Sequence, residues 1–302
     1  MSSSSHRFER HLNEADCVDA RAECPTCGRT SPRAAVSVLQ TSPKIEYLYC
    51  SDCRGFSASS MPTREYLKRY YTQLYEPSYR FVSISEMFAK YLATEIPIKP
   101  HMRILDFGGG RGDLGMNLAR LMRDGGANTV DVTLVDLNTA SWPDEQGITF
   151  CWFSDLGELE DVFDVVIASV ILEHIPALHP IVQLLLDRIA PGGLFYARTP
   201  YRLPLQRLLG GLSMYFPMHV HDLGPSFWNR VPDRYRVALE IVASRPAIVE
   251  ARLSGRHVEA VIATLLKLPA RIERWARRNP KDFMWNLVGG WEVLFRRQHN
   301  GQ

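Results

Sequence analysis

The stretch MRILDFGGGRGDLG at residues 102–115 decides the fold. Its first six residues are mostly apolar and have the length of a buried strand, and a run of glycines follows at once. Residues 116–123 then have the pattern of a helix. Glycines at a strand-to-helix turn let a ligand approach the backbone closely, so the stretch predicts an α/β fold with a ligand site at this turn.

The glycine loop by itself fits two cofactors. Gly110, Gly112 and Gly115 satisfy the GxGxxG pattern of dinucleotide-binding folds. Asp106, Gly108, Gly110 and Gly112 equally satisfy DxGxGxG, the loop of class I methyltransferases. A carboxylate at Asp106 would repel a pyrophosphate, whereas a methionine-derived ligand offers an ammonium and a sulfonium. The loop therefore favours S-adenosylmethionine, with NAD as the alternative.

Acidic residues follow the next two predicted strands. The strand over 130–135 ends in Asp136, and an acid there can accept both ribose hydroxyls of either cofactor. The strand over 148–153 leads to Asp155 and Leu156. Because strands alternate with helices through residues 101–200, the pattern is that of a parallel sheet covered on both faces.

Two further segments resemble one family. FDVVIASVILEHIP at 163–176 and IAPGGLFYARTP at 189–200 look like the fourth and fifth units of class I S-adenosylmethionine-dependent methyltransferases. The resemblance implies a Rossmann-like, seven-stranded, mostly parallel sheet with helices on both faces. In that family an acid at the place of Asp155 takes the adenine amino group, and an apolar neighbour packs the ring. The cofactor residues so implied are Asp106, Gly108, Gly110, Gly112, Asp136, Leu137, Asp155, Leu156 and Ser169.

The resemblance also implies two late strands in the C-terminal third. Residues 248–253 are the expected sixth strand, and residues 289–295 suit a seventh that runs antiparallel to the others. A helical insertion near 256–286 is interpreted as a cap on the sheet or as a surface for a homodimer.

Four of the six cysteines form two CxxC pairs near the N-terminus: Cys24, Cys27, Cys50 and Cys53. Two such turns joined by a hairpin give a tetrahedral four-thiolate site, the preferred structural coordination of Zn²⁺. The alternatives are a labile iron site and thiols that pair by chance. Because all four thiolates are used, the predicted zinc is structural, in a zinc ribbon over residues 20–58.

These features predict four parts of the chain: a flexible N-terminus over 1–19, the ribbon, a helical connecting or lid segment over 59–100, and a methyltransferase domain over 101–302. The connecting segment is rich in tyrosine, which indicates either core packing or phenols that line a polar pocket.

A base is needed to take a proton from the acceptor, and histidine is the natural candidate. His174 and His221 are the candidates here. The layout resembles that of sugar C-methyltransferases, which implies catalytic roles for His174, His221 and Tyr75 or Tyr79. Val220 stands where that family has a glutamate, and the family's long C-terminal domain is missing, so O- or N-methylation fits as well. His219 and His221 could also form a metal pair, but the sequence offers no evident third ligand.

The composition is that of a globular protein, with 46% apolar and 23% charged residues. The net charge of +2 is too small to indicate nucleic acid by itself. The sequence has no apolar signal core and no long apolar run, so we expect a cytoplasmic protein without a membrane span. The expected function is methylation of a small polar acceptor, such as a sugar, a nucleotide-linked sugar or another biosynthetic intermediate. The alternative is an RNA base methyltransferase whose ribbon holds RNA; a scaffold without activity is the third.

Overall fold

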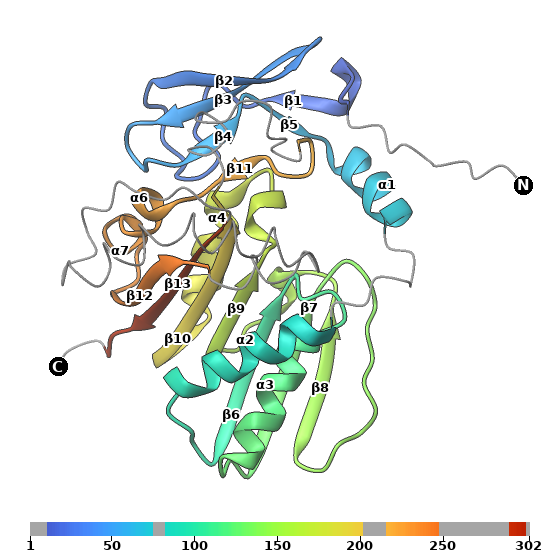
Figure 1. The fold of residues 1–302 in the computed structure, drawn as a ribbon, viewed down its shortest axis with the longest axis vertical. Coiled ribbons are helices and arrows are strands. Elements are labelled where there is room, and N and C mark those ends of the chain that lie inside the picture. Colours follow the sequence, from blue (N-terminus) through green and yellow to red (C-terminus); the bar gives the residue numbers. More distant parts are fainter. Residues whose placement is uncertain (1–10, 75–81, 202–215, 248–289, 300–302) are drawn as a thin grey trace, which may run out of the picture.

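A seven-stranded sheet forms the centre of the computed structural model, which describes residues 11–74, 82–201, 216–247 and 290–299 (Figure 1). The order of its strands is β12-β13-β10-β9-β6-β7-β8. Their bounds, in that order, are Leu239–Pro246, Gly290–Arg297, Ile189–Pro200, Phe163–Ser169, His101–Phe107, Thr129–Val135 and Ile148–Phe153. Strands β10, β9, β6, β7 and β8 are parallel, and β13 runs antiparallel to both of its neighbours.

The expected Rossmann-like, mostly parallel sheet is thereby confirmed, including the antiparallel strand near 289–295. The edge strand differs from the expectation, because β12 ends at Pro246. The predicted sixth strand at 248–253 and the helical insertion near 256–286 lie outside the described residues. Charged residues concealed β12 in the sequence; Arg245, for example, is neutralised by a contact with Glu292 on β13 that only the folded sheet supplies.

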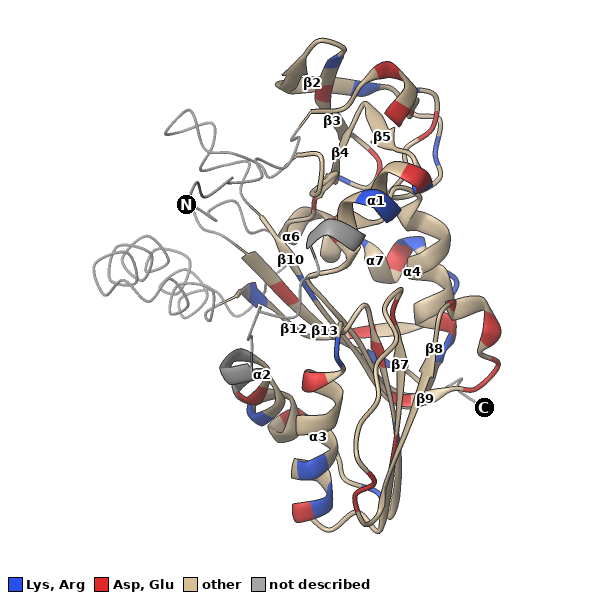
Figure 2. Ribbon diagram, turned by 90° about the vertical axis from the view of Figure 1, so that its right-hand side faces the viewer, with Lys and Arg blue, Asp and Glu red and all other residues tan. Residues whose placement is uncertain are grey.

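Helices cover both faces of the sheet because alternate strand residues point to opposite sides. On one face, α2 (Val82–Glu95) and α3 (Asp113–Asp124) pack on residues such as Val165 and Ile167. On the other face, α4 (Leu178–Asp187) packs on Val166 and Ala168. Figure 2 shows α2 and α3 together on one side of the strands.

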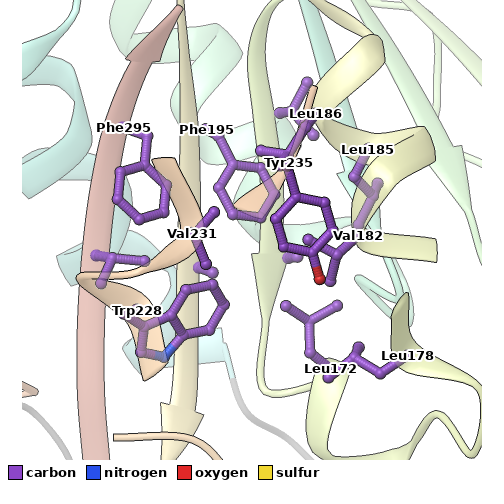
Figure 3. Close-up of a cluster of buried hydrophobic side chains, with 14 of the residues drawn as sticks. Leu172, Leu178, Val182, Leu185, Leu186, Phe195, Trp228, Val231, Tyr235 and Phe295 are labelled. Carbon is purple, nitrogen blue, oxygen red and sulfur yellow. The ribbon is translucent and has the colours of Figure 1, made fainter. Parts of the chain in front are cut away.

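Two short helices complete the second face. These are α6 (Pro225–Trp228) and α7 (Val231–Arg234). Figure 3 shows Trp228 and Val231 packed between the sheet residues Phe195 and Phe295 and the leucines of α4. This cluster extends without a break to Cys24, Cys50 and Cys53, so the cysteines belong to the main hydrophobic core.

The N-terminal part forms a second, four-stranded sheet above the carboxyl ends of the large one (Figure 1). Its order is β11-β4-β3-β2, with bounds His221–Asp222, Phe56–Ala58, Lys44–Cys50 and Arg33–Thr41. Strand β11 comes from the segment after β10, so the methyltransferase part of the chain contributes an edge strand to the ribbon. A separate pair, β1 (Cys17–Asp19) with β5 (Ser60–Pro62), leads into α1 (Arg64–Leu74).

Candidate functional site

The turn after β6 holds its shape through its own backbone. Gly108 N donates to Val135 O at 2.7 Å, which ties the turn to the end of β7. Gly115 N, in the first turn of α3, donates to Asp106 Oδ2 at 3.0 Å. Asp106 is buried, and burial raises the pKa of its carboxyl to about 7.

The glycines of this turn are needed for different reasons. Gly108, Gly110 and Gly112 have φ values of 66°, 63° and 79°, which favour glycine. A Cβ at Gly108 would overlap Ile171, and one at Gly109 would overlap the Asp106 carboxylate. A Cβ at Gly110 would meet no atom within 4 Å. Gly110 is therefore the point of the turn at which a ligand can approach the backbone.

Asp136 faces this open point from the end of β7. Its Oδ2 accepts from Gly110 N at 2.8 Å, and its Oδ1 accepts from Asn138 N at 3.0 Å. Burial is the main cause of a raised pKa at this carboxyl. Leu137, the next residue, exposes 70% of its surface. An exposed leucine beside a partly buried carboxylate offers an apolar contact next to a hydrogen-bond acceptor.

The other predicted cofactor residues lie along the same edge of the sheet. Asp155 follows β8, is exposed, and caps the short helix η2 (Leu156–Glu158) by accepting from Gly157 N at 2.7 Å. Leu156 is buried in the core. Ser169 ends β9, and its Oγ accepts from Arg198 Nε at 3.2 Å. The glycine turn after β6 therefore lies at the same edge of the sheet as the ends of β7, β8 and β9.

Val170, the residue after β9, has an uncommon backbone conformation. Val170 has φ of 60°, and its N donates to Arg198 O at 2.8 Å. A β-branched residue in this region is strained, and such strain is often found at functional sites. The turn at Val170 leads directly into η3 (Leu172–His174).

His174 is the centre of a polar cluster at this edge. Its Nδ1 donates to Met218 O at 3.0 Å, and its Nε2 lies 3.7 Å from Glu173 Oε1. The rings of His174 and His219 are 4.7 Å apart between centroids and nearly perpendicular. Tyr71 of α1 meets His174 edge-on at 6.1 Å. Burial lowers the pKa of His174 to about 4, so the ring is neutral at pH 7.

His221 occupies a different setting from His174. It is fully buried in β11, its Nε2 lies 2.8 Å from Ile175 O, and burial lowers its pKa to about 4. Its pairing with Ser57 of β4 gives it a clear structural task. Sequence reasoning named His221 as a candidate base, named His219 only as part of a possible metal pair with His221, and gave Tyr71 no catalytic role. Tyr75 and Tyr79 lie outside the described residues.

The four predicted cysteines come together. Cys24 Sγ lies 3.8 Å from Cys53 Sγ, and Cys27 Sγ lies 3.9 Å from Cys50 Sγ. All four sulfur atoms are within 4.8 Å of one another. These separations are too long for disulfides and match a tetrahedron with metal–sulfur bonds of ~2.3 Å, whose edges are ~3.8 Å. Hydrogen bonding to Cys27 is the main cause that lowers the pKa of the Cys24 thiol to about 7.

Residues of the main domain form hydrogen bonds to both cysteine turns. His179 N, at the start of α4, donates to Pro25 O at 2.8 Å, and Tyr235 Oη donates to Thr26 O at 3.1 Å. Arg234 Nη2 donates to Asp52 O at 2.7 Å in the second turn. The cysteine site is therefore built into the main domain.

Residues 78–231 of the chain match the sequence model of a family described as "Methyltransferase domain". No curated protein sequence matches the chain. Similar solved structures include coclaurine N-methyltransferase bound to N-methylheliamine and SAH, at 14% identity and a TM-score of 0.45, covering 74% of this chain and 73% of that one. An S-adenosylmethionine-dependent methyltransferase from Mesorhizobium loti has 19% identity and a TM-score of 0.43, covering 69% and 96%. The plantazolicin methyltransferase BpumL in complex with SAH has 14% identity and a TM-score of 0.44, covering 78% and 90%.

Proposed function

Because the chain belongs to this methyltransferase-domain family and is an S-adenosylmethionine-dependent methyltransferase, we propose that its acceptor is a small polar molecule. A sugar, a nucleotide-linked sugar or a related biosynthetic intermediate is the class we favour. The observation that supports it is the polar cluster of Tyr71, Glu173, His174 and His219 beside the glycine turn.

We propose that the cofactor binds at the carboxyl ends of β6, β7, β8 and β9. Asp136 would bind the ribose hydroxyls, and Asp106 would face the methionine end. Gly110 would let the ligand approach the backbone, and Gly108 and Gly112 would keep the turn in the shape that this needs. Leu137 would pack on the adenine, with Asp155 and Ser169 at the same edge of the sheet. Leu156 stays a prediction as a second adenine contact, although it is buried in the core in this structure. Bound S-adenosylmethionine supplies an electrophilic methyl group on a positively charged sulfur.

The protein's remaining task is to orient the acceptor and to remove its proton. Orientation alone lowers such a barrier by up to ~7–11 kcal/mol. His174 is the candidate residue for both tasks, because its Nδ1 is engaged by Met218 O and its Nε2 keeps a free lone pair. A pKa of about 4 makes the ring a weak base by itself at neutral pH. His221, Tyr75 and Tyr79 stay proposals as further catalytic residues.

We also propose that the four cysteines hold Zn²⁺ in a structural role. Their spacing fits a closed tetrahedral site, which leaves no coordination position for an acceptor.

RNA base methylation finds less support. Two basic residues of the ribbon pair with neighbouring acids: Lys44 with Glu46 at 2.8 Å, and Arg21 with Asp19 at 2.8 Å. Both signs of charge alternate over this module in Figure 2. A phosphate-binding face would need unpaired cations in a stripe. Salt-sensitive retention on an RNA column would reverse this preference.

The test of the cofactor site is the substitution Asp136→Ala. Removing a carboxylate that makes two hydrogen bonds to ribose should weaken S-adenosylmethionine binding by ~100-fold or more, measured by calorimetry. Asp131→Asn, at the opposite end of the same strand, is the matched control and should bind normally. The zinc content of both variants should stay unchanged. Equal affinity in the two variants would contradict the assignment.

The acceptor itself is identified by label transfer. The protein is incubated with methyl-labelled S-adenosylmethionine and a fractionated metabolite extract, and the labelled product is followed. Label in a small polar compound supports the proposal, and label only in RNA contradicts it.

A further inference from the structure

We propose that Glu173, His174 and His219 bind a divalent cation, in a second metal site separate from the four cysteines. The inference rests on the proposed function in one respect, namely that the acceptor lies at this edge of the sheet. The binding of the cation itself depends only on the three side chains.

The three side chains present a recognised ligand set. One carboxylate oxygen of Glu173 and one ring nitrogen from each histidine lie within 4.8 Å of one another. The distance between Glu173 Oε1 and His174 Nε2 is 3.7 Å, close to the ligand separation around a four-coordinate ion with bonds of ~2.0–2.2 Å. Two imidazoles and one carboxylate are the ligands of catalytic zinc sites and of non-haem iron sites.

The environment of His174 orients it as a ligand. Its Nδ1 donates to the backbone oxygen of Met218 at 3.0 Å, so the hydrogen is on that nitrogen and the Nε2 lone pair points toward Glu173. Metal-bound histidines have this arrangement, in which the second nitrogen donates to a carbonyl or carboxylate.

The loop that carries His219 is held in place from the ribbon. Tyr47 Oη donates to His219 O at 3.2 Å, and Val220 N donates to Glu173 O at 2.9 Å. The first bond ties the loop to β3 of the ribbon, and the second ties it to η3. The two segments that supply the ligands are therefore fixed relative to each other before any ion arrives.

Three protein ligands leave at least one coordination position open, which is the mark of a catalytic site. The ligand class that suits this position is an acceptor with an oxygen donor, such as a hydroxyl beside a carboxylate, a phosphate or a second hydroxyl. A bound cation lowers the pKa of a coordinated hydroxyl. With a cation held there, the coordinated O–H bond would break and its proton would pass to water. The oxygen would use the freed electron pair to bond to the methyl carbon, while the bond from that carbon to sulfur breaks and its electron pair stays on sulfur, giving S-adenosylhomocysteine.

The test uses the full-length protein with zinc already in the cysteine site and Co²⁺ as the probe. We expect about one further equivalent of Co²⁺ to bind, measured by calorimetry, with an absorption spectrum that lacks the sulfur-to-cobalt band of thiolate coordination. His219→Ala should weaken this binding by more than about tenfold. His101→Ala, at the opposite end of the sheet, is the matched histidine control and should bind Co²⁺ as the wild type does.

Two results would overturn the proposal: no further equivalent bound by the wild type, or equal binding by His219→Ala. Glu173→Gln is a second variant, and loss of binding with an unchanged circular dichroism spectrum supports the site. None of these measurements contains S-adenosylmethionine or an acceptor, so a failure here leaves the cofactor test with Asp136→Ala unaffected.

Discussion

Gly110 combines a left-handed backbone with empty space where a side chain would be. In Gly110→Ala, the strain should cost about 1–2 kcal/mol of stability, and the added methyl group should occupy the space that the cofactor needs. We expect S-adenosylmethionine affinity to fall by more than about tenfold, because the ligand must approach this backbone closely. Calorimetric titration of the folded variant measures the loss.

Gly126 supplies the control for this substitution. It also has a positive φ, 110°, and open space at its Cβ, but it lies in the loop after α3. Gly126→Ala should lose a similar amount of stability and keep full affinity. If the two variants bind the cofactor equally well, the glycine turn is not the approach point.

Asp106 should make the stability of the cofactor-free protein depend on pH. The pKa of its carboxyl is about 7 in the folded state, against 3.8 for an ordinary aspartate. Between these values the folded state binds more protons than the unfolded state, so stability falls as pH rises. The loss between pH 5.5 and pH 8 should be about 2 kcal/mol. Asp106→Asn should lack this component, and urea unfolding of both proteins at the two pH values would measure the difference.

At the residue scale, the sequence predicted best what is local along the chain. The spacing of Asp106, Gly108 and Gly110 is set within one turn, so the pattern alone predicted a glycine turn there, and the structure has one. The sequence paired His219 with His221 and found no third ligand, because Glu173 and His174 are brought to His219 only by the fold. His221 has the same residue type two positions later, and only the structure shows that it pairs with the ribbon.

At the scale of elements, the hydrogen bond from Tyr47 Oη of β3 to His219 O adds to the pairing of β4 with β11 in joining the ribbon to the loop after β10. Tyr47→Phe removes the phenol oxygen and keeps the ring in its buried place. The fold should lose only about 0.5–1.5 kcal/mol, whereas the turnover number should fall several-fold because the loop is less well held. S-adenosylmethionine affinity should stay the same.

Tyr49→Phe is the matched control for Tyr47→Phe, since Tyr49 is on the same strand and packs on Phe56. Its turnover should equal that of the wild type. Equal turnover in Tyr47→Phe and wild type would show that this hydrogen bond does not position the loop.

The strands of the sheet were predicted well where they are uniformly apolar, as in 163–169, and poorly where cross-strand partners neutralise charge. Arg245 of β12 is one such case. The pairing of β4 with β11 was also missed, because a strand of two residues has no periodicity to detect.

At the scale of the whole molecule, the ribbon and the methyltransferase part share one hydrophobic core. Cys53 contacts the same cluster as Phe227 and Leu178. Cys53→Ser should therefore lose metal and lower the stability of the entire protein by several kcal/mol, with one cooperative unfolding transition. Differential scanning calorimetry tests this, with the exposed Cys151→Ser as the control that should unfold like the wild type.

Two separate transitions in Cys53→Ser, with the second at the wild-type temperature, would mean that the ribbon is an independent domain. The sequence suggested a boundary near residue 58, since the cysteine spacing is a self-contained pattern. Contacts such as Tyr235 to Thr26 link residues that are far apart in the chain, and no local pattern reveals them. Within the described residues, no helix has the length and apolar character needed to cross a membrane.

The position of β13 between β10 and β12 has a consequence for how the protein is made. Both neighbours leave the ribosome before residues 290–297 do, so the newly synthesised chain carries an open backbone edge on β10 during that interval. Unpaired edges recruit strands from other chains. Nascent chains that stall or are cut within residues 248–289 would keep that edge exposed, and they would be substrates for chaperones or proteases.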